Sequence, residues 1–258
     1  VALSLVACDQ GSGSSFARKS TTTSSHQSPV DDGTSSNGEE NELPDDADTG
    51  DTGDTAGQPA PALSAVDINA ARTALGSLPT RGFSPNVPKY DRNEFGKPWS
   101  DDVTVDGGHN GCDTRNDILA RDLTDVEFKP AKRNCIVTKG KLNDPYTNTT
   151  IEFKRGRKSS DLIPIDHVVA LGDAWYSGAY QWDADRRRNF ANDPINLQAT
   201  NRESNTQKSA KNAAEWLPPN TAYQCEYVGR QITIKSTYGL SVTPAEKNAM
   251  EKVLATCS

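Results

Sequence analysis

Hydrophobic and polar positions divide the chain into a long polar stretch and a patterned remainder. Between residues 9 and 62 the chain consists mainly of Ser, Thr, Gly, Asp, Glu and Pro, with few apolar side chains. Such a stretch cannot bury enough apolar surface to offset the entropy lost on ordering. We therefore expect a disordered tether over 9–62 and one folded domain over 63–258, which is long enough to form its own core.

Apolar residues recur at helical spacing in several parts of this remainder. A helix over 64–76 is predicted, with Ser64 as its cap and Gly76 as its stop. The last helix opens with Thr243, three residues before Glu246, which is the spacing of a capping box. The other predicted helices cover residues 112–123, 171–177, 184–191, 202–217 and 222–235.

Runs of β-forming residues lie between these helices. They predict strands at 135–140, 149–153, 162–169 and 195–200. Strands and helices are interleaved without the regular rhythm of βαβ units, and we find no internal repeat. The fold class that this order predicts is α+β.

The strand around residues 162–169 contains two adjacent ionisable residues, Asp166 and His167. Buried strands seldom hold such residues without partners, because removing a charge from water costs several kcal/mol. The chain has three histidines: His26 lies in the expected tether, and His109 lies beside two glycines, where we expect a loop. A lone histidine in a strand is most often structural, so its partners decide the interpretation of His167.

Three polar residues further along the chain supply these partners. Asn196 opens the next strand, Asn205 lies nine residues later on a predicted helix, and Lys208 lies three residues beyond it. A strand ending in Asp-His, a strand opening with Asn-Leu and a helix with Asn-x-x-Lys form, in this order, the pattern of the HNH or ββα-metal nucleases. The chain resembles that superfamily, with Asn205 where many members have His.

Longer segments make the resemblance more specific. The segments "GCDTRNDILARDL", "VVALGDAWYSGAYQW", "NDPINLQAT" and "EWLPP" look like a secreted group related to the C-terminal domain of GmrSD-type restriction enzymes. The likeness extends from about residue 85 to residue 258. It implies an α+β fold with a ββα-metal core and added helices, and it implies a nuclease.

Phosphodiester hydrolysis needs an in-line water, a base, and positive charge on the phosphate and the leaving oxygen. His167 suits the base, because an imidazole with a reference pKa of about 6.5 accepts a proton near neutral pH. Asp166 and Asn205 would supply two hard oxygen ligands, which favour one Mg²⁺ or Mn²⁺ ion over zinc. The resemblance implies that Asn196 contacts no metal but ties the loop together and orients the base.

Two basic residues are candidates for contact with the substrate. Lys208 would face a phosphate or scaffold its helix, and both roles stay open. Arg115 would reach the scissile phosphate or form a structural salt bridge, and the two alternatives weigh equally. The basic runs 153–158 and 185–190 either follow a nucleic-acid backbone or are solvated surface.

Four of the five cysteines lie in the predicted domain. None belongs to a C-x-x-C pair, so zinc-ribbon spacing is absent and disulfides are the better interpretation. Four cysteines allow three connectivities. We favour Cys112–Cys135 and Cys225–Cys257, because each pair closes a local loop.

The N-terminal residues 1–8 also indicate export. An apolar run ends in Leu5-Val6-Ala7-Cys8 directly before the tether, which resembles a bacterial lipobox with Cys8 as the lipidated residue. The alternative is a piece of an ordinary signal peptide with a chance cysteine. No run of about 18 apolar residues predicts a membrane span. The only membrane contact expected is therefore a lipid at Cys8, at the outer face of a bacterial cell membrane.

The net charge of −7 comes from the tether, where 11 acidic residues oppose Arg18 and Lys19. Residues 63–258 have a small excess of positive charge, which is compatible with a nucleic-acid partner, and nothing in the sequence indicates a protein partner. The leading interpretation is an exported, metal-dependent endonuclease that acts on DNA with little sequence preference. An RNase of the same chemistry and a catalytically inactive, surface-anchored nucleic-acid-binding protein are the alternatives.

Overall fold

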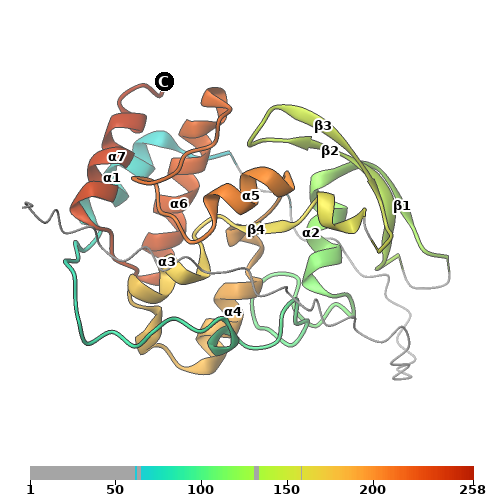
Figure 1. Cartoon of the computed structure of the whole chain (residues 1–258), viewed down its shortest axis with the longest axis horizontal. Coiled ribbons are helices and arrows are strands. Elements are labelled where there is room, and N and C mark those ends of the chain that lie inside the picture. The colour runs from blue at the N-terminus through green and yellow to red at the C-terminus, as the bar shows by residue number, and fades with distance from the viewer. Residues whose placement is uncertain (1–61, 63–64, 131–133, 158) are drawn as a thin grey trace, which may run out of the picture. The chain divides into compact units, whose positions relative to one another are not determined.

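The computed structural model describes residues 62, 65–130, 134–157 and 159–258 (Figure 1). All of them belong to one unit of the chain, Gly53–Ser258. Cys8, residues 9–61 and Ser64 lie outside the described residues, so the lipid anchor, the disorder of the tether and the domain boundary stay predictions. None of the helices that the structure describes is long and apolar enough to cross a membrane.

A three-stranded antiparallel sheet forms one part of the α+β fold. Its strands β1 (Leu123–Phe128), β2 (Val137–Asp144) and β3 (Thr149–Lys154) are neighbours in space in the order of the sequence. β2 and β3 correspond to two predicted strands, whereas no pattern predicted β1. This edge strand contains several polar residues and pairs irregularly with β2 between Thr124 and Glu127, which explains why its sequence lacks a clear alternation.

A separate two-stranded antiparallel sheet contains the Asp-His pair. Its strands are β4 (Ile165–His167) and β5 (Leu197–Ala199), and all six residues are buried. The 3-10 turn η4 (Pro194–Asn196) leads into β5, and helix α5 (Arg202–Lys208) follows it. Both strands and the helix occur at the positions and in the order that the sequence predicted, although α5 is shorter.

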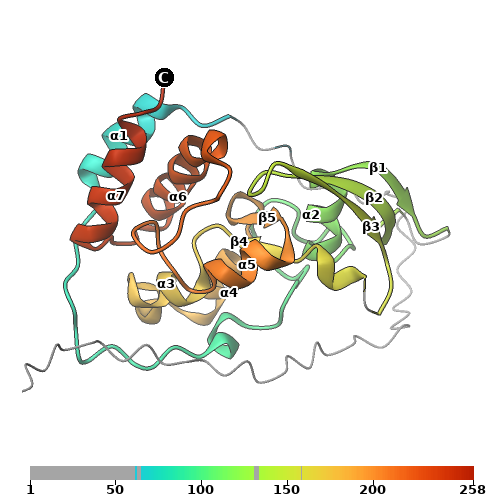
Figure 2. The same cartoon turned by 45° about the horizontal axis from the view of Figure 1, so that its top comes forward.

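Helices supply most of the remainder. α1, α6 and α7 lie side by side in both views, and α6 packs against the other two (Figures 1 and 2). The helices and 3-10 turns whose bounds have not yet been given are α1 Ile68–Ser77, η1 Arg92–Phe95, α2 Thr114–Asp122, η2 Ser160–Leu162, α3 Leu171–Tyr176, η3 Ala179–Gln181, α4 Ala184–Asn192, η5 Thr221–Tyr223, α6 Gln224–Tyr238 and α7 Pro244–Leu254.

Local capping explains where the first and last helices begin. α7 begins with the predicted capping box, in which the side chains of Thr243 and Glu246 each accept the backbone N–H of the other. The prediction that the first helix begins at residue 64 is wrong. α1 begins at Ile68, because the carboxylate of Asp67 accepts the N–H groups of the first helical turn.

The predicted extent of the helix over 202–217 is also wrong. α5 ends at Lys208, and Ser209 adopts a left-handed backbone with φ of 48°. The residues that follow form tight turns instead, in which Asn212 and Glu215 side chains accept backbone N–H groups. Short polar side chains compete with helical hydrogen bonds in this way, and the helical pattern of apolar residues did not reveal it.

Two hydrophobic cores support these elements. One lies among the helices, and the other lies between α2 and the strands of both sheets. Ile165 of β4 belongs to the second core, whereas Val168 and Val169, directly after β4, belong to the first. Asp166 and His167 therefore stand at the junction of the two cores, where neighbouring elements can supply polar partners.

The structure contains both disulfides with the connectivity favoured from the sequence. Cys112 pairs with Cys135, and Cys225 pairs with Cys257. The first joins the start of α2 to the residues before β2, and the second joins the start of α6 to the C-terminal end. Each bond closes a loop of moderate length, as expected.

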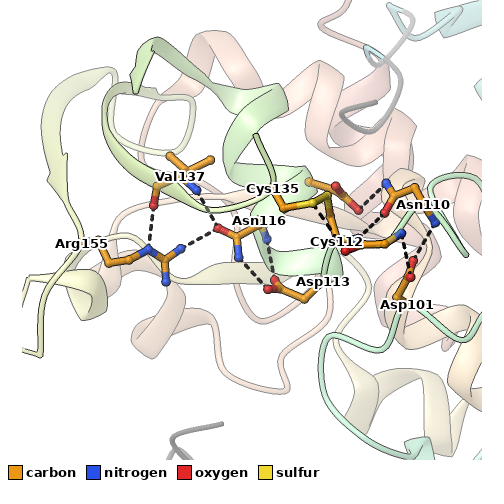
Figure 3. The surroundings of a disulfide bond; sticks show 10 residues. Asp101, Asn110, Cys112, Asp113, Asn116, Cys135, Val137 and Arg155 are labelled. Carbon is orange, nitrogen blue, oxygen red and sulfur yellow. Dashed lines mark hydrogen bonds between the residues drawn. A yellow bond between two sulfur atoms is a disulfide. The ribbon is translucent and has the colours of Figure 1, made fainter. Parts of the chain in front are cut away.

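Figure 3 shows how the Cys112–Cys135 region is tied together. The side-chain oxygen of Asn116 accepts hydrogen bonds from the Val137 N–H (3.0 Å) and from Arg155 (2.6 Å), while its Nδ2 donates to Asp113 (2.6 Å). One amide therefore connects α2 to β2 and to the residue after β3. These bonds hold the three-stranded sheet against α2, which also packs against β4 and β5.

We expect the replacement of Cys225 and Cys257 by Ala to lower the free energy of unfolding. Their separation of 32 residues corresponds to roughly 3–4 kcal/mol on the chain-entropy model. Urea unfolding of the double variant and the wild type measures this difference. Reduction of the wild type should produce a loss at least as large, because it opens Cys112–Cys135 as well, and an unchanged unfolding midpoint in both experiments would contradict the expectation.

Candidate active site

Asp166 is buried and both of its carboxylate oxygens have partners. Oδ1 accepts from the ammonium of Lys208 at 2.9 Å, and Oδ2 accepts from the hydroxyl of Tyr146 at 2.7 Å. The ammonium of Lys208 also donates to the backbone oxygen of His167 at 2.8 Å. These three bonds answer why a charged residue is stable in this buried strand: its charge is neutralised by a lysine from α5.

Lys208 is itself 0 % exposed. The sequence left two roles open for this residue, contact with phosphate or support of its helix. Its contacts with Asp166 and with the backbone of β4 support the second role, because a fully buried ammonium that already has two partners presents no donor to a bound polymer. Lys208 thus attaches α5 to β4.

Asn205 lies one helical turn before Lys208, so both side chains occupy the face of α5 that meets β4. It is half-buried, and its side chain forms no hydrogen bond with the residues that the structure describes. The role of Asn205 as a metal ligand stays a prediction.

Asn196 is 0 % exposed and lies just before β5. Its Oδ1 accepts the N–H of Val169 at 2.8 Å, and its Nδ2 donates to the oxygen of the same residue at 3.3 Å. Its backbone oxygen also accepts the N–H of Val168 at 2.7 Å. Asn196 thus fixes the chain directly after His167, and its contribution to catalysis stays a prediction.

His167 is 8 % exposed, and its Nε2 lies 2.9 Å from the backbone oxygen of Ala191 at the end of α4. Because a carbonyl oxygen only accepts, we assign the ring hydrogen to Nε2. Nδ1 is then the atom that can accept a proton. The ring of Trp99 lies nearly parallel to the imidazole, at an interplanar angle of 14° and a centroid distance of 6.1 Å.

The environment of His167 favours the neutral imidazole. Burial lowers the pKa of His167 from 6.5 to about 3, and the positive charges of Arg92 and Lys208 act in the same direction. The hydrogen bond to Ala191 opposes this shift only in part. The imidazole is therefore neutral at physiological pH, and Nδ1 is available as an acceptor. The same shift makes it a weaker base than an unperturbed imidazole, whose pKa of about 6.5 lies closer to the working pH.

Arg115 binds the segment that leads into β4. Its guanidinium donates to the backbone oxygens of Ser160 (3.0 Å) and Ile163 (3.1 Å). Both contacts are with backbone oxygens of the segment before β4. The half-buried guanidinium supports the approach of the chain to Asp166 and His167, and contact with a phosphate stays a prediction.

The predicted metal ligands can be tested for fit against their surroundings. The structure contains no group of three His, Cys, Asp or Glu side chains able to hold a metal among its described residues. A carboxylate has about four acceptor positions, of which Lys208 and Tyr146 occupy two at Asp166. Together with the amide oxygen of Asn205, the predicted donor set would consist of hard oxygens, the type of ligand that Mg²⁺ and Mn²⁺ prefer.

Sequence reasoning missed three residues at this site. Tyr146 lies in the turn after β2, and no pattern in the sequence connects this turn to Asp166. Trp99 and Arg92 lie outside every predicted helix and strand, so no pattern assigned them to the site. A signal for Trp99 could have come from its Pro- and Gly-rich surroundings, because an aromatic residue in such a segment needs a packing partner. Which residue that partner is depends on the tertiary fold, and no local signal indicates the position of Arg92.

The basic run 185–190 is largely used within the protein. Arg186 donates to the backbone oxygen of Tyr238 at 2.7 Å, Arg187 binds Glu94 at 3.0 Å, and Arg188 lies 3.3 Å from Asp185. These guanidinium groups stabilise α4 and its neighbours. In the other run, Arg155 is tied to Val137 and Asn116, and Lys158 lies outside the described residues.

The sequence of the domain matches a known family. Residues 113–253, more than half of the chain, match the family described as "GmrSD restriction endonucleases, C-terminal domain". The chain therefore belongs to this family. The match contains Asp166, His167, Asn196 and Asn205, and it begins after the segment that contains Arg92 and Trp99.

A curated relative covers more of the chain. A protein of Arthroderma benhamiae (strain ATCC MYA-4681 / CBS 112371), named "Uncharacterized secreted protein", is 37 % identical over 203 residues, which is 77 % of this chain and 92 % of the relative. No solved structure matches the chain.

We expect Lys208→Ala to lower the free energy of unfolding by about 3–5 kcal/mol, because it leaves the buried carboxylate of Asp166 without its counter-charge. Lys211→Ala is the matched control: this exposed lysine, three residues after Lys208, should change the free energy of unfolding by no more than about 0.5 kcal/mol. Urea unfolding measures both. Equal stability of the two variants would contradict a supporting role for Lys208.

The low pKa of His167 has a consequence for stability. The folded state keeps His167 neutral down to about pH 3, whereas the unfolded chain takes up this proton near pH 6.5. This residue should therefore stabilise the fold above pH 6.5, and its contribution should decline as the pH falls from 6.5 towards 3. Urea unfolding of wild type and His167→Gln over this range isolates the effect, and parallel pH dependences would exclude it.

Proposed function

We propose that the domain is an exported endonuclease that hydrolyses phosphodiester bonds of DNA with little sequence preference, using His167 as general base and one divalent metal ion. The family supports a nuclease, since its description names restriction endonucleases. The observation that carries the proposal is the state of His167. Its Nε2–H is bound to the oxygen of Ala191, so a neutral imidazole keeps Nδ1 as its acceptor.

The order of elements supports the proposed ββα-metal core. β4 contains Asp166 and His167, Asn196 directly precedes β5, and Asn205 lies on α5. We propose that these three elements form the ββα unit. The bonds from Lys208 to β4 support this proposal, because they hold the helix against the strand on which the base lies.

In the proposed reaction, Nδ1 of His167 accepts a proton from the attacking water. The water oxygen forms a bond to phosphorus while the opposite phosphorus–oxygen bond breaks, and the leaving oxygen takes a proton from solvent. Asn196 keeps the chain after His167 in place and so fixes the direction of the imidazole. The metal, which Asp166 and Asn205 would hold, supplies positive charge to the phosphate and the leaving oxygen.

Little sequence preference follows from what the site can reach. A compact site that acts on phosphates reads the backbone, which is the same in every sequence. An RNase of the same chemistry remains the alternative for the substrate, and an inactive nucleic-acid-binding protein is the alternative for the function.

Export of the protein is supported by two observations. The two disulfides fit an oxidising, extracellular location. The relative from Arthroderma benhamiae is named a secreted protein. Lipid attachment at Cys8 goes further than these observations, and it stays a prediction because Cys8 lies outside the described residues.

We expect His167→Ala to lower the cleavage rate by roughly 10²–10⁴, the usual contribution of a general base. His109→Ala is the control, since this exposed loop histidine should be dispensable. Purified variants are incubated with plasmid, single-stranded DNA and RNA, in the presence of Mg²⁺, Mn²⁺ or EDTA.

Cleavage of RNA alone would support the RNase. Binding without cleavage of any polymer would support the inactive protein. Turnover by His167→Ala at the rate of His109→Ala would remove His167 from the role of base.

A further inference from the structure

The segment 92–99 precedes the family match at residues 113–253, yet it forms one wall of a hollow beside His167. Arg92, Lys97 and Trp99 come from this segment, and Asn192 lines the hollow from the end of α4. The enclosed part measures about 20 Å³, which is room for one water molecule. The hollow is therefore a shallow recess at the proposed base rather than a deep pocket.

The segment is held rigidly by its neighbours. Phe95 is 2 % exposed, and its ring packs at 6.2 Å from the rings of Trp175 and Phe190. Glu94 forms an ion pair with Arg187 of α4 at 3.0 Å. Because a core aromatic and an ion pair anchor this short segment, the side chains on either side of Phe95 extend from a fixed backbone.

Arg92 and Lys97 differ from the other cations near the site. Both are exposed, and neither forms a hydrogen bond or an ion pair with any residue in the part of the chain that the structure describes. The arginines of α4, in contrast, bind protein partners. Two uncompensated cations on a rigid segment attract an anion, and the charge of Arg92 already acts on the His167 imidazole.

Two further features mark the lining of this hollow. On the α4 side, the Oδ1 of Asn192 is buried and has no hydrogen-bond partner among the described residues. Because an amide oxygen only accepts, it suits the water molecule for which the hollow has room, and not a phosphate oxygen. Trp99 adopts a left-handed backbone with φ of 57°, a conformation that is strained for a bulky residue. Unsatisfied polar atoms and backbone strain of this kind are concentrated at functional sites.

We propose that the mouth of this hollow is a phosphate-binding subsite, where the exposed Arg92 and Lys97 hold a backbone phosphate of the nucleic acid next to the phosphate that reacts at His167. The inference rests on the proposed nuclease function and names how the substrate is held there. A guanidinium binds two phosphate oxygens at once, and an ammonium adds a point charge. Contacts of this type position the strand without reading its sequence.

The test measures binding without cleavage. Full-length protein is titrated with a short fluorescein-labelled DNA duplex in EDTA at a series of salt concentrations, and the slope of log K against log salt is compared between variants. Each lost phosphate contact should reduce the magnitude of this slope by about 1. We expect a reduction of about 1 for Arg92→Gln and for Lys97→Gln, about 2 for the double variant, and none for the exposed control Lys252→Gln.

The loss of affinity should be equal for two duplexes of unrelated sequence, and the thermal unfolding midpoints should match the wild type because both residues are exposed. A double variant with the wild-type slope would overturn the subsite, and so would a wild type without salt-dependent binding. Cleavage is assayed separately with Mg²⁺ or Mn²⁺. A wild type that binds with the expected slope but cleaves no polymer would overturn the proposed function alone.

Discussion

The buried ion pair between Asp166 and Lys208 is the interaction on which the candidate site depends. It crosses from β4 to α5, and the same ammonium binds the backbone of His167. Without it, a charged residue could not lie where the two cores meet, because the cost of burying an isolated carboxylate far exceeds what this short sheet can supply. The pair therefore allows the protein to keep a carboxylate buried in the strand that also holds His167.

His167 shows the opposite use of burial. The same low-polarity surroundings that require Asp166 to have a counter-charge keep the imidazole uncharged, and its bond to Ala191 selects which nitrogen holds the hydrogen. Two adjacent residues of one strand thus have different kinds of partner. Charged Asp166 is surrounded by donors, whereas neutral His167 is surrounded by an aromatic ring, a carbonyl oxygen and positive charge.

The order of elements around the site could be predicted because local signals are strong there. The runs at β4 and β5 and the capping box at α7 each depend on a few neighbouring residues. The prediction failed where distant contacts or turns decide. β1 is a strand because it pairs with β2, and α5 stops at Lys208 because the chain turns at Ser209. Neither outcome is visible in the apolar pattern of the segment itself.

The sequence by itself determined the α+β class, because apolar spacing distinguishes helices from strands without coordinates. It favoured the cysteine pairs among three connectivities, and its resemblance to a nuclease family supplied the candidate set Asp166, His167, Asn196 and Asn205. Only the tertiary structure decided what surrounds them. Lys208 became a support of β4 and Arg92 a neighbour of His167, because residues far apart in the chain meet only when both cores pack. Burial, hydrogen-bond partners and hence the protonation of His167 are properties of that packing, and no local pattern contains them.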